Sequence, residues 1–508
     1  MGLTTVVRGA LLAVGLDRAG RAALDETLVA KPRGRAGYPE PPSFRICGRP
    51  TLFGDEVGGA LLLPRYSDVA LRLMQEAPPR KPAYAVGVDG FEWNAAERLR
   101  DGQLAGVERV MAELTASGGC IINGDTGSGK TVVALHVLSR LRPRRALVLV
   151  DQVDIARQWA DRARRFLPGV ALKFFGDGAS ARALRRSYPN GPETRGELVI
   201  GTAQTLARQA VELLPPERYD ALVCDEVHVF AAPTFAHALY TIDFGYAIGL
   251  TATEDRKDAL QWVFKAFLGR TSIPFAGETA DPRVTAVNVP DMPEVRENDH
   301  YAVHCSRLHV DTTVAKCAVC PHRDQFPACG GRLPVNDEGN IEWGDKLDRA
   351  GLLDAILTPT YANWLHERVI APLFRAGRRA FVFSERIAFL RLLHDRGYAE
   401  FGADAVGVYV GERSASERAA RAEALKRQIT YCSYGVARKA LDVPDKDAAV
   451  FGTPISDGRQ AAGRIRRVHA GKREPLLVVP VLPYGFAKRA WFRLLRQFKE
   501  ARWIVERA

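Results

Sequence analysis

The chain has few cysteines and no long hydrophobic run. Eight cysteines in 508 residues are too few for a disulfide scaffold, so we expect a protein of the reducing cytoplasm, or of the host cytoplasm if it is phage-encoded. No apolar stretch approaches the roughly 20 residues that span a bilayer. The apolar run at residues 6–14 is interrupted by Arg8 and has no clean small-residue cleavage site. We therefore expect no membrane partner, and we interpret this run as an ordinary helix or strand.

The rest of the composition is typical of a globular protein with a polyanionic partner. Hydrophobic residues make up 47% of the chain and charged residues 26%, which are ordinary values for folded domains. A length of 508 residues allows several domains of roughly 100–200 residues each. The net charge of +12 favours nucleic acid as a partner, although charge alone is a weak indicator.

The glycine-rich stretch at residues 120–131 predicts a phosphate-binding loop. Apolar residues precede it, and residues 132–135 have the pattern of a helix start. In this order of strand, turn and helix, the motif G-x-x-x-x-G-K-[ST] binds a nucleoside triphosphate, whereas a glycine-rich turn without a ligand is the alternative. Lys130 would reach the β- and γ-phosphates, and Thr131 would ligate magnesium. The motif consists of Gly124, Asp125, Thr126, Gly127, Ser128, Gly129, Lys130 and Thr131.

Two series of short apolar runs alternate with amphipathic stretches. Runs of this kind, bounded by turns and separated by helices, indicate parallel sheets that are covered on both faces. We therefore expect an α/β fold with two tandem parallel-sheet domains. The first series is 146–150, 198–200, 221–224 and 247–250, and the second is 380–383, 406–410, 429–431, 448–450 and 476–479.

These patterns divide the chain into four segments. Residues 1–90 contain no catalytic constellation and are expected to form a small N-terminal accessory domain. Residues 91–285 carry the phosphate loop and the first series, and residues 356–508 carry the second series and a basic, amphipathic closing helix. Residues 286–355 have no clear βα rhythm and hold four of the eight cysteines, so we interpret them as an insertion or linker.

Two carboxylates follow the apolar run that ends at Cys224. Parallel strands bring their carboxyl ends to one edge of a sheet, so we expect Asp225 and Glu226 near the phosphate loop. Asp225 would hold the metal, directly or through water, and Glu226 would position and deprotonate the attacking water. An exposed Asp-Glu turn is the alternative.

A run of arginines in the second series could supply the complementary charge. We expect Arg464 and Arg467 to lie one helical turn apart and to face the same direction. A guanidinium that reaches the γ-phosphate from a second domain stabilises the charge of the transition state. Taken alone, three arginines in four residues would indicate a solvated or phosphate-binding face.

Together these motifs resemble those of the superfamily 2 helicases and translocases, and within them the DEAH/XPB-like group. The likeness covers about residues 95–480 apart from the insertion. The matching segments are Arg100 and Gln103 before the loop, 124–131 (motif I), 225–228 (motif II), 251–253 (motif III), 381–384 (motif IV), 441–444 (motif V), and Gln460, Gly463, Arg464 and Arg467 (motif VI).

The resemblance implies roles for residues that patterning alone does not assign. It implies two RecA-like domains that share one ATP. Arg100 and Gln103 fall in the segment that contacts adenine, with Gln103 reading the base. Asp442 would lie near the ribose, and Gln460 would help to order the γ-phosphate.

The cysteines of the insertion suggest a structural zinc site. Four thiolates can bind zinc tetrahedrally and so stabilise a small irregular segment. The spacing is not that of a paired C-x-x-C ribbon, and free cysteines in a loop are the alternative. The expected ligands are Cys305, Cys317, Cys320 and Cys329, with His304, His309 and His322 as substitutes for the fourth.

The resemblance implies an ATP-dependent DNA helicase or translocase, with ATP and Mg²⁺ as cofactors, that moves along single-stranded or branched DNA held by its backbone. The choice of DNA over RNA rests on the resemblance only, because a protein that contacts the nucleic-acid backbone can bind either one. One alternative is the translocating subunit of a restriction system, although no convincing P-D…(D/E)-x-K nuclease motif is present. Another is an ATP-binding nucleic-acid clamp with little turnover, since Lys439 and Ala440 replace a common Glu-Gly and Glu254 replaces a common Pro.

Overall fold

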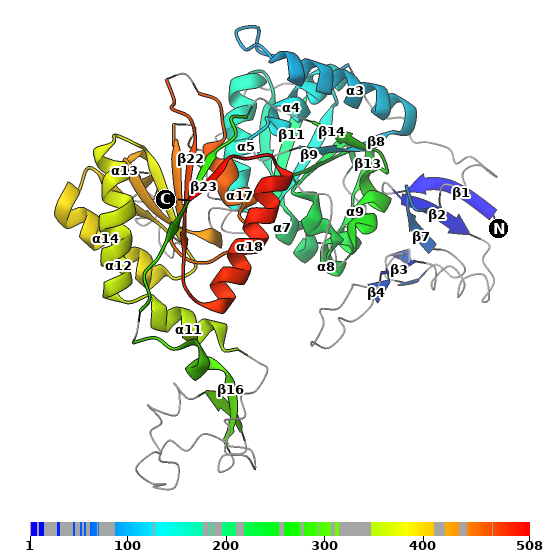
Figure 1. Ribbon diagram of the computed structural model, residues 1–508. Coiled ribbons are helices and arrows are strands. Elements are labelled where there is room, and N and C mark those ends of the chain that lie inside the picture. The colour runs from blue at the N-terminus through cyan, green and yellow to red at the C-terminus, as the bar shows by residue number, and fades with distance from the viewer. Residues whose placement is uncertain are drawn as a thin grey trace. The chain divides into compact units, whose positions relative to one another are not determined.

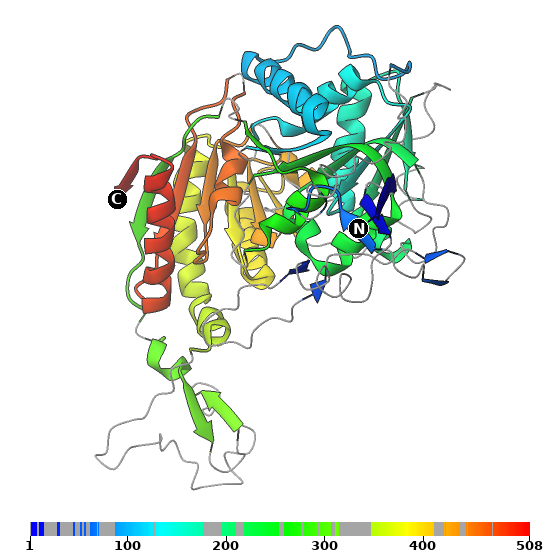
Figure 2. The ribbon, with the colours of Figure 1, turned by 90° about the vertical axis from the view of Figure 1, so that its right-hand side faces the viewer.

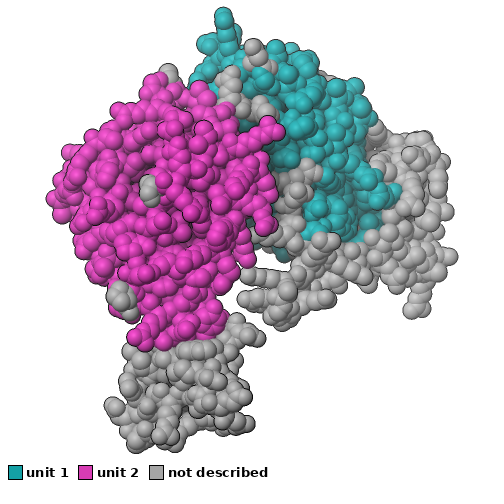
Figure 3. Space-filling view, viewed as in Figure 1, with its two compact units in different colours: residues 1–278 teal, residues 279–508 magenta. Residues whose placement is uncertain are grey.

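The computed structural model describes most of residues 87–507 and parts of the N-terminal segment, and it falls into two compact units, Met1–Glu278 and Thr279–Ala508 (Figure 3). The described residues are 2–7, 10–14, 28–30, 44–45, 51–52, 55–56, 61–68, 70, 87–124, 127–175, 182, 186, 196–209, 218–252, 259–275, 279–292, 294–305, 310–313, 347–410, 421, 423–435, 443, 445–469 and 471–507.

The first unit is built on a parallel sheet of seven strands, in the order β10-β11-β9-β12-β13-β8-β14. Its strands are buried on both faces, which explains why they appear in the sequence as continuous apolar runs. The strands are β8 (Gly119–Asn123), β9 (Arg145–Val150), β10 (Ala171–Phe174), β11 (Glu197–Thr202), β12 (Arg218–Asp225), β13 (Asp243–Thr251) and β14 (Ser272–Pro274).

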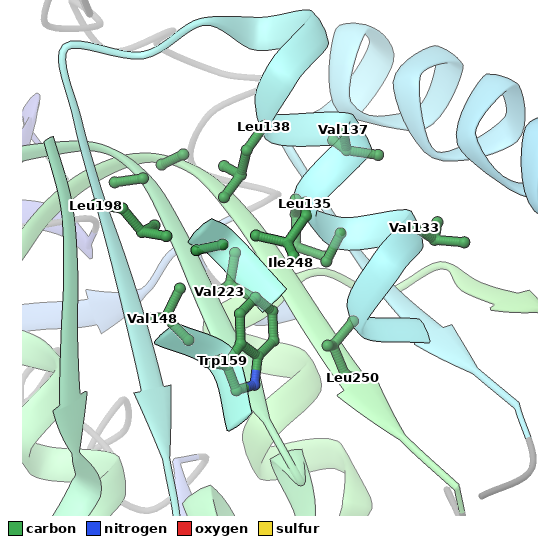
Figure 4. Packing of buried hydrophobic residues seen from close by; sticks show 14 of the residues in the cluster. Val133, Leu135, Val137, Leu138, Val148, Trp159, Leu198, Val223, Ile248 and Leu250 are labelled. Carbon is green, nitrogen blue, oxygen red and sulfur yellow. The ribbon is translucent and has the colours of Figure 1, made fainter. Parts of the chain in front are cut away.

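Helices cover both faces of this sheet (Figure 1). One face carries α3 (Asp101–Ser117), α4 (Lys130–Leu141) and α5 (Val153–Phe166). Figure 4 shows Leu135 and Leu138 of α4 and Trp159 of α5 packed against strand residues such as Val148, Val223 and Ile248. The other face carries α7 (Ala203–Gln209), η1 (Val227–Ala231), α8 (Pro233–Ala238), η2 (Leu239–Thr241) and α9 (Gln261–Leu268).

The N-terminal segment contributes short antiparallel strands, and residues 6–7 and 10–14 of the apolar run lie in two of them. β1, β2 and β7 form one sheet. Just after β7, Arg65 Nη1 donates to the Gly245 carbonyl at 2.7 Å, and the Tyr66 amide donates to the Ala266 carbonyl at 2.8 Å. These strands are β1 (Gly2–Val7), β2 (Ala10–Val14), β3 (Val29–Ala30), β4 (Phe44–Arg45), β5 (Thr51–Leu52), β6 (Asp55–Glu56) and β7 (Leu61–Pro64).

The second unit contains another parallel sheet of seven strands, in the order β19-β20-β18-β21-β22-β15-β23. The predicted α/β fold with two tandem parallel sheets is therefore confirmed. The strands are β15 (Arg283–Asn288), β18 (Ala380–Ser384), β19 (Val406–Tyr409), β20 (Ile429–Ser433), β21 (Ala448–Phe451), β22 (Leu476–Val481) and β23 (Val505–Arg507).

Two apolar clusters pack on the second sheet. One includes residues of α11 (Arg349–Ile356), α12 (Pro359–Leu365), η5 (His366–Ile370), α13 (Ala371–Arg375) and α14 (Ile387–Phe401). The other includes residues of α17 (Arg459–Ala462), η6 (Gly463–Ile465) and α18 (Gly485–Glu500), and α18 lies along the sheet as the expected closing helix (Figure 2). Among the described residues, no helix is both long enough and apolar enough to cross a bilayer.

The sequence patterns indicated that the first domain ends at residue 285. In the structure the second unit already begins at Thr279. β15 lies between β22 and β23 of the second sheet. The next strand of this sheet along the chain, β18, begins almost a hundred residues later, so no local βα rhythm marks β15 as a sheet strand. η3 (Glu297–His300), β16 (Ala302–Cys305) and β17 (Val310–Thr313) follow it, and the last two pair as an antiparallel hairpin.

Candidate functional site

The glycine-rich loop leads from β8 into α4 as the sequence predicted. Gly127 and Gly129 have φ angles of +90° and +100°, which glycine adopts without the strain of a side chain. A Cβ on Gly124 would lie 2.3 Å from the Phe275 carbonyl oxygen, so only glycine allows this strand end to approach its neighbour. Asp125 and Thr126 lie outside the described residues.

Polar groups of the loop point to an anionic ligand. Lys130 begins α4, and its Nζ donates to the carbonyl of Gly124 at the start of the loop. Ser128 is 2% exposed, and its hydroxyl has no hydrogen-bond partner within the described part of the chain. Buried hydroxyls without partners are rare, and a phosphate oxygen would satisfy this one. The backbone N–H groups at the start of α4 add positive potential.

The register of three strands brings the carboxylates to the same sheet edge. β12 pairs with β13 so that Asp225 lies opposite Leu250, and β13 pairs with β8 so that Thr251 lies opposite Asn123. The amide of Gly124 donates to the Thr251 carbonyl at 3.0 Å. The threonine of motif III therefore ties the strand after the carboxylates to the first residue of the phosphate loop.

Two side chains of α5 hold the expected metal ligands. Trp159 Nε1 donates to Asp225 Oδ2 at 2.8 Å, and Arg162 Nη1 donates to Thr131 Oγ1 at 3.1 Å. Trp159 and Arg162 are three residues apart and therefore lie on one side of the helix. Sequence reasoning missed both, and the only available signal was this i, i+3 spacing on the helix after β9.

The electrostatics at Asp225 favour a bound cation. Burial raises the pKa of Asp225 above its ordinary value, and the neighbouring Glu226 carboxylate adds to the rise. The Trp159 hydrogen bond and the positive charges of Lys130 and Arg162 lower this pKa. A divalent cation would offset both causes of the rise, so the oxygens of Asp225 and Thr131 fit a magnesium site.

Glu226 has an unusual backbone conformation. Its φ of +53° lies in the left-handed region, which non-glycine residues seldom occupy. Its amide donates to Asp225 Oδ1 at 3.0 Å, and its Oε2 lies 3.4 Å from His228 Nδ1. The turn directs consecutive carboxylates to different partners, so the two side chains can take separate roles.

Gln103 lies against the end of the loop. It is 8% exposed, and its Oε1 accepts from the Arg100 amide at 3.1 Å. A Cβ on Gly129 would lie 2.3 Å from Gln103 Nε2. The segment before the loop therefore meets the start of α4, although Gln103 and Lys130 are 27 positions apart in the sequence.

In the second unit, the expected helix across the arginines is shorter than predicted. α17 ends at Ala462 and η6 ends at Ile465, and Arg467 forms an isolated β-bridge with Thr279. The prediction that Arg464 and Arg467 are one helical turn apart is therefore wrong. The chain leaves the helix because Arg467 pairs with the segment that precedes β15. Gln460 lies in α17, and both Gln460 and Arg464 are partly exposed.

The third arginine of this run, Arg466, has a structural role. Its Nη2 donates to Thr279 Oγ1 at 2.9 Å and to Asp281 Oδ1 at 2.8 Å. Its guanidinium also lies over the Trp503 ring, 5.3 Å from the centroid. Arg466 therefore joins three segments of the second unit that are far apart in the sequence.

Several expected site residues lie outside the described residues, namely Asp442, Cys317, Cys320 and Cys329. For Cys305 the structure describes only the backbone, at the end of β16. Within the described part of the chain, no group of three or more His, Cys, Asp or Glu side chains is arranged to hold a metal ion. Cys120, Cys224 and Cys432 are buried and free.

Comparisons with known proteins match the part of the chain that carries this site. Residues 97–256 match the family model described as type III restriction enzyme, res subunit. The segment contains α3, the phosphate loop and both carboxylates. The predicted resemblance to superfamily 2 helicases and translocases is confirmed.

Viral and archaeal proteins show the same likeness. A candidate helicase of Escherichia phage T5, D10, is 30% identical over 37% of this chain and 39% of its own length. A candidate ATP-dependent RNA helicase of Acanthamoeba polyphaga mimivirus, L396, is 21% identical over 75% of this chain and 63% of its own. The DNA 3′-5′ translocase XPB2 of Sulfurisphaera tokodaii is 29% identical over 34% of each chain. The chain thus spans less than two thirds of each of these relatives.

Proposed function

We propose that this chain is an ATP-dependent helicase or translocase that couples ATP hydrolysis to movement along DNA. The observation that carries the proposal is the convergence of Lys130, Thr131 and Asp225 at one edge of the first sheet. The family match over residues 97–256 supports it. DNA is favoured over RNA by the XPB-like motifs, and single-stranded or branched DNA is the proposed track.

The residues of the first unit divide the work of hydrolysis. Lys130 and the loop amides bind the phosphates, and Gln103 with Arg100 contacts adenine. Thr131 and Asp225 would hold Mg²⁺, which neutralises charge on the phosphates when bound. Glu226 orients the attacking water and accepts its proton, and His228 Nδ1 lies 3.4 Å from Glu226 Oε2.

The second unit completes the reaction. Gln460, Arg464 and Arg467 would act on the γ-phosphate, and the resemblance assigns Asp442, which is outside the described residues, to the ribose. Positive charge at the γ-phosphate stabilises the transition state and makes hydrolysis depend on closure of the two units. Opening after hydrolysis then moves the nucleic acid along.

Hydrolysis is tested with Glu226→Gln and Lys130→Ala in the full chain. Removing a general base costs roughly 10²–10⁴-fold in rate, so E226Q should bind ATP as wild type does while its DNA-stimulated ATPase falls at least 100-fold. K130A should lose ATP binding. A wild-type rate no higher than that of E226Q would instead identify a clamp with little turnover. Parallel measurements with single-stranded, duplex and forked DNA and with RNA identify the track.

The description of the matching family model favours one second candidate, the translocating subunit of a restriction system. A translocase that is not a helicase would move along duplex DNA without separating the strands. It should therefore displace a triplex-forming oligonucleotide and leave a forked duplex intact, whereas a helicase should separate the fork.

We also propose a structural zinc ion bound by Cys305, Cys317, Cys320 and Cys329. The C-x-x-C spacing of the middle pair supports it. Elemental measurement of the purified protein should give one zinc per chain, and Cys317→Ser should release it and lower stability. Less than about half a zinc per chain, together with an unchanged stability of C317S, would contradict this site.

A further inference from the structure

The outer face of α18 carries a stripe of basic residues. The 16 residues of this helix include five basic side chains and one carboxylate, Glu500. All five basic side chains are exposed, and Arg502 just beyond the helix is exposed too. Within the described part of the chain, none of these side chains forms an ion pair. The stripe consists of Lys488, Arg489, Arg493, Arg496, Lys499 and Arg502.

Several other surface arginines of the protein have carboxylate partners. On α4, for example, Arg140 pairs with Glu108 at 2.8 Å, and in the second unit Arg375 pairs with Glu400 and Arg386 pairs with Asp354. Such pairing disperses the positive charge. The stripe on α18 concentrates it instead, which is the electrostatic pattern of a surface that binds a polyanion.

An exposed aromatic ring lies within the stripe. Phe492 is 60% exposed, and a helical rotation of 100° per residue places it between Lys488 and Arg496 on the same face. Among the described residues, Phe492 belongs to neither of the apolar clusters of the second unit. Aromatic rings beside basic side chains are a common arrangement for binding single-stranded nucleic acid, because bases stack on the ring while phosphates meet the cations.

A membrane does not fit this helix. An amphipathic helix binds a bilayer through its apolar face. In α18 that face is already occupied, because Trp491, Leu494 and Phe498 are buried in the core of the second unit. The face that remains available is therefore the basic one with Phe492.

We propose that the outer face of α18 is an accessory binding site for single-stranded nucleic acid, with Phe492 stacking on a base and the basic stripe contacting the phosphates. From Lys488 to Lys499 the stripe extends for roughly 16 Å, enough to follow a few nucleotides of a strand. The inference rests on the proposed function in one respect, namely that nucleic acid is the partner of this chain.

The phosphate contacts are tested by anisotropy with labelled dT20 on the full-length protein at several KCl concentrations. Arg493→Gln with Arg496→Gln should weaken binding about tenfold and reduce the slope of log K against log[KCl] by roughly 1.4, at about 0.7 per phosphate contact. The matched control is Arg368→Gln with Arg391→Gln, two exposed arginines of the same unit on η5 and α14. Basal ATPase should be unchanged in both double variants.

The stacking contact is tested with Phe492→Ala. Loss of one stacked base should weaken dT20 binding at least roughly fivefold, and the loss should disappear with an abasic strand of the same length. Tyr398→Ala, which removes another exposed ring, is the control. Equal weakening of F492A on both strands would overturn the stacking role.

The outcomes separate this inference from the proposed function. Wild-type protein that binds none of the nucleic acids would overturn the proposed function and this site with it. Normal wild-type binding that R493Q/R496Q leaves unchanged in affinity and salt slope would overturn the α18 site alone.

Discussion

Trp159 belongs both to the core and to the candidate site. Its indole is fully buried between α5 and the sheet, and its ring nitrogen donates to Asp225 at 2.8 Å. A carboxylate with one oxygen held in this way keeps a fixed direction, so the other oxygen can meet a cation without reorganisation. Arg162 restrains Thr131 similarly.

Trp159→Phe is expected to weaken magnesium binding and leave metal-free nucleotide binding unchanged. Phenylalanine keeps most of the packing and lacks the N–H donor. Loss of a hydrogen bond to a metal ligand typically costs 10–100-fold in metal affinity, so the Mg²⁺ concentration for half-maximal nucleotide binding should rise about tenfold. Trp262→Phe, a matched change at an exposed site of the same unit, should not alter it. An unchanged Mg²⁺ requirement in W159F would contradict the positioning role.

At the scale of elements, α18 is capped by a residue far away in the sequence. Glu297 of η3 accepts from the amides of Gly485 and Phe486 at 2.5 and 3.1 Å. A carboxylate at a helix N-terminus satisfies free N–H groups and interacts favourably with the helix dipole.

Glu297→Gln should therefore lower the free energy of unfolding by about 1 kcal/mol, because the side chain loses its charge at the helix N-terminus. The exposed Glu294 is three residues away, and Glu294→Gln is the matched control. Urea denaturation of both variants measures the difference. Equal urea midpoints for E297Q and E294Q would show that the Glu297 cap does not contribute to the free energy of unfolding.

A buried lysine joins the amino ends of strands in the second sheet. Lys446 is fully buried, and its Nζ donates to the Arg427 carbonyl at 2.6 Å and to Thr430 Oγ1 at 2.8 Å. Burial, with help from the nearby Arg379, lowers the pKa of Lys446 to about 7. The folded chain thus releases this proton at a lower pH than the unfolded chain, in which the lysine has its ordinary pKa.

Lys446→Met should change how stability depends on pH. Between about pH 7 and the ordinary lysine pKa, the unfolded state binds more protons at this site, so its contribution to stability rises with pH. From pH 7 to pH 9 wild type should gain about 2 kcal/mol relative to K446M, measured by urea denaturation at each pH. Parallel pH profiles for the two proteins would contradict a neutral buried lysine.

At the scale of the whole molecule, the proposed hydrolysis needs groups from both units. Lys130 and Glu226 belong to the first, and Arg464 and Arg467 belong to the second. Replacing neighbouring arginines of this motif is nevertheless expected to have different effects, because Arg466 bonds to Thr279 and Asp281 of its own unit whereas Arg464 is proposed to act on the γ-phosphate.

Arg464→Gln should lower the ATPase about 100-fold while ATP affinity changes less than about threefold, since its charge acts in the transition state. Arg466→Gln should instead lower the free energy of unfolding by about 1–2 kcal/mol, as hydrogen bonds to Thr279 and Asp281 are lost. ATPase and urea denaturation are measured on both variants. Loss of stability in R464Q with normal turnover would contradict its role.

The local patterns of the chain determined much of this. Apolar runs bounded by turns predicted most strands of both sheets but not β10, β14, β15 or β23, since a strand buried on two faces needs apolar residues at consecutive positions. The glycine-rich loop could also be predicted from the sequence, because its left-handed backbone at Gly127 and Gly129 requires glycine. The two carboxylates that follow an apolar run predicted that Asp225, the last residue of β12, lies at the same sheet edge as the loop.

Only the tertiary structure decided the contacts between segments far apart in the chain. Trp159 and Asp225 are 66 residues apart, and no local period encodes such a pair. β15 pairs with β22 and β23, which lie more than 180 residues later in the chain. The residues around β15 therefore could not predict that it belongs to the second sheet. Arg467 left the predicted helix to pair with Thr279. Backbone conformation follows from nearby residues, whereas the choice of distant partners depends on how all the packed faces fit together.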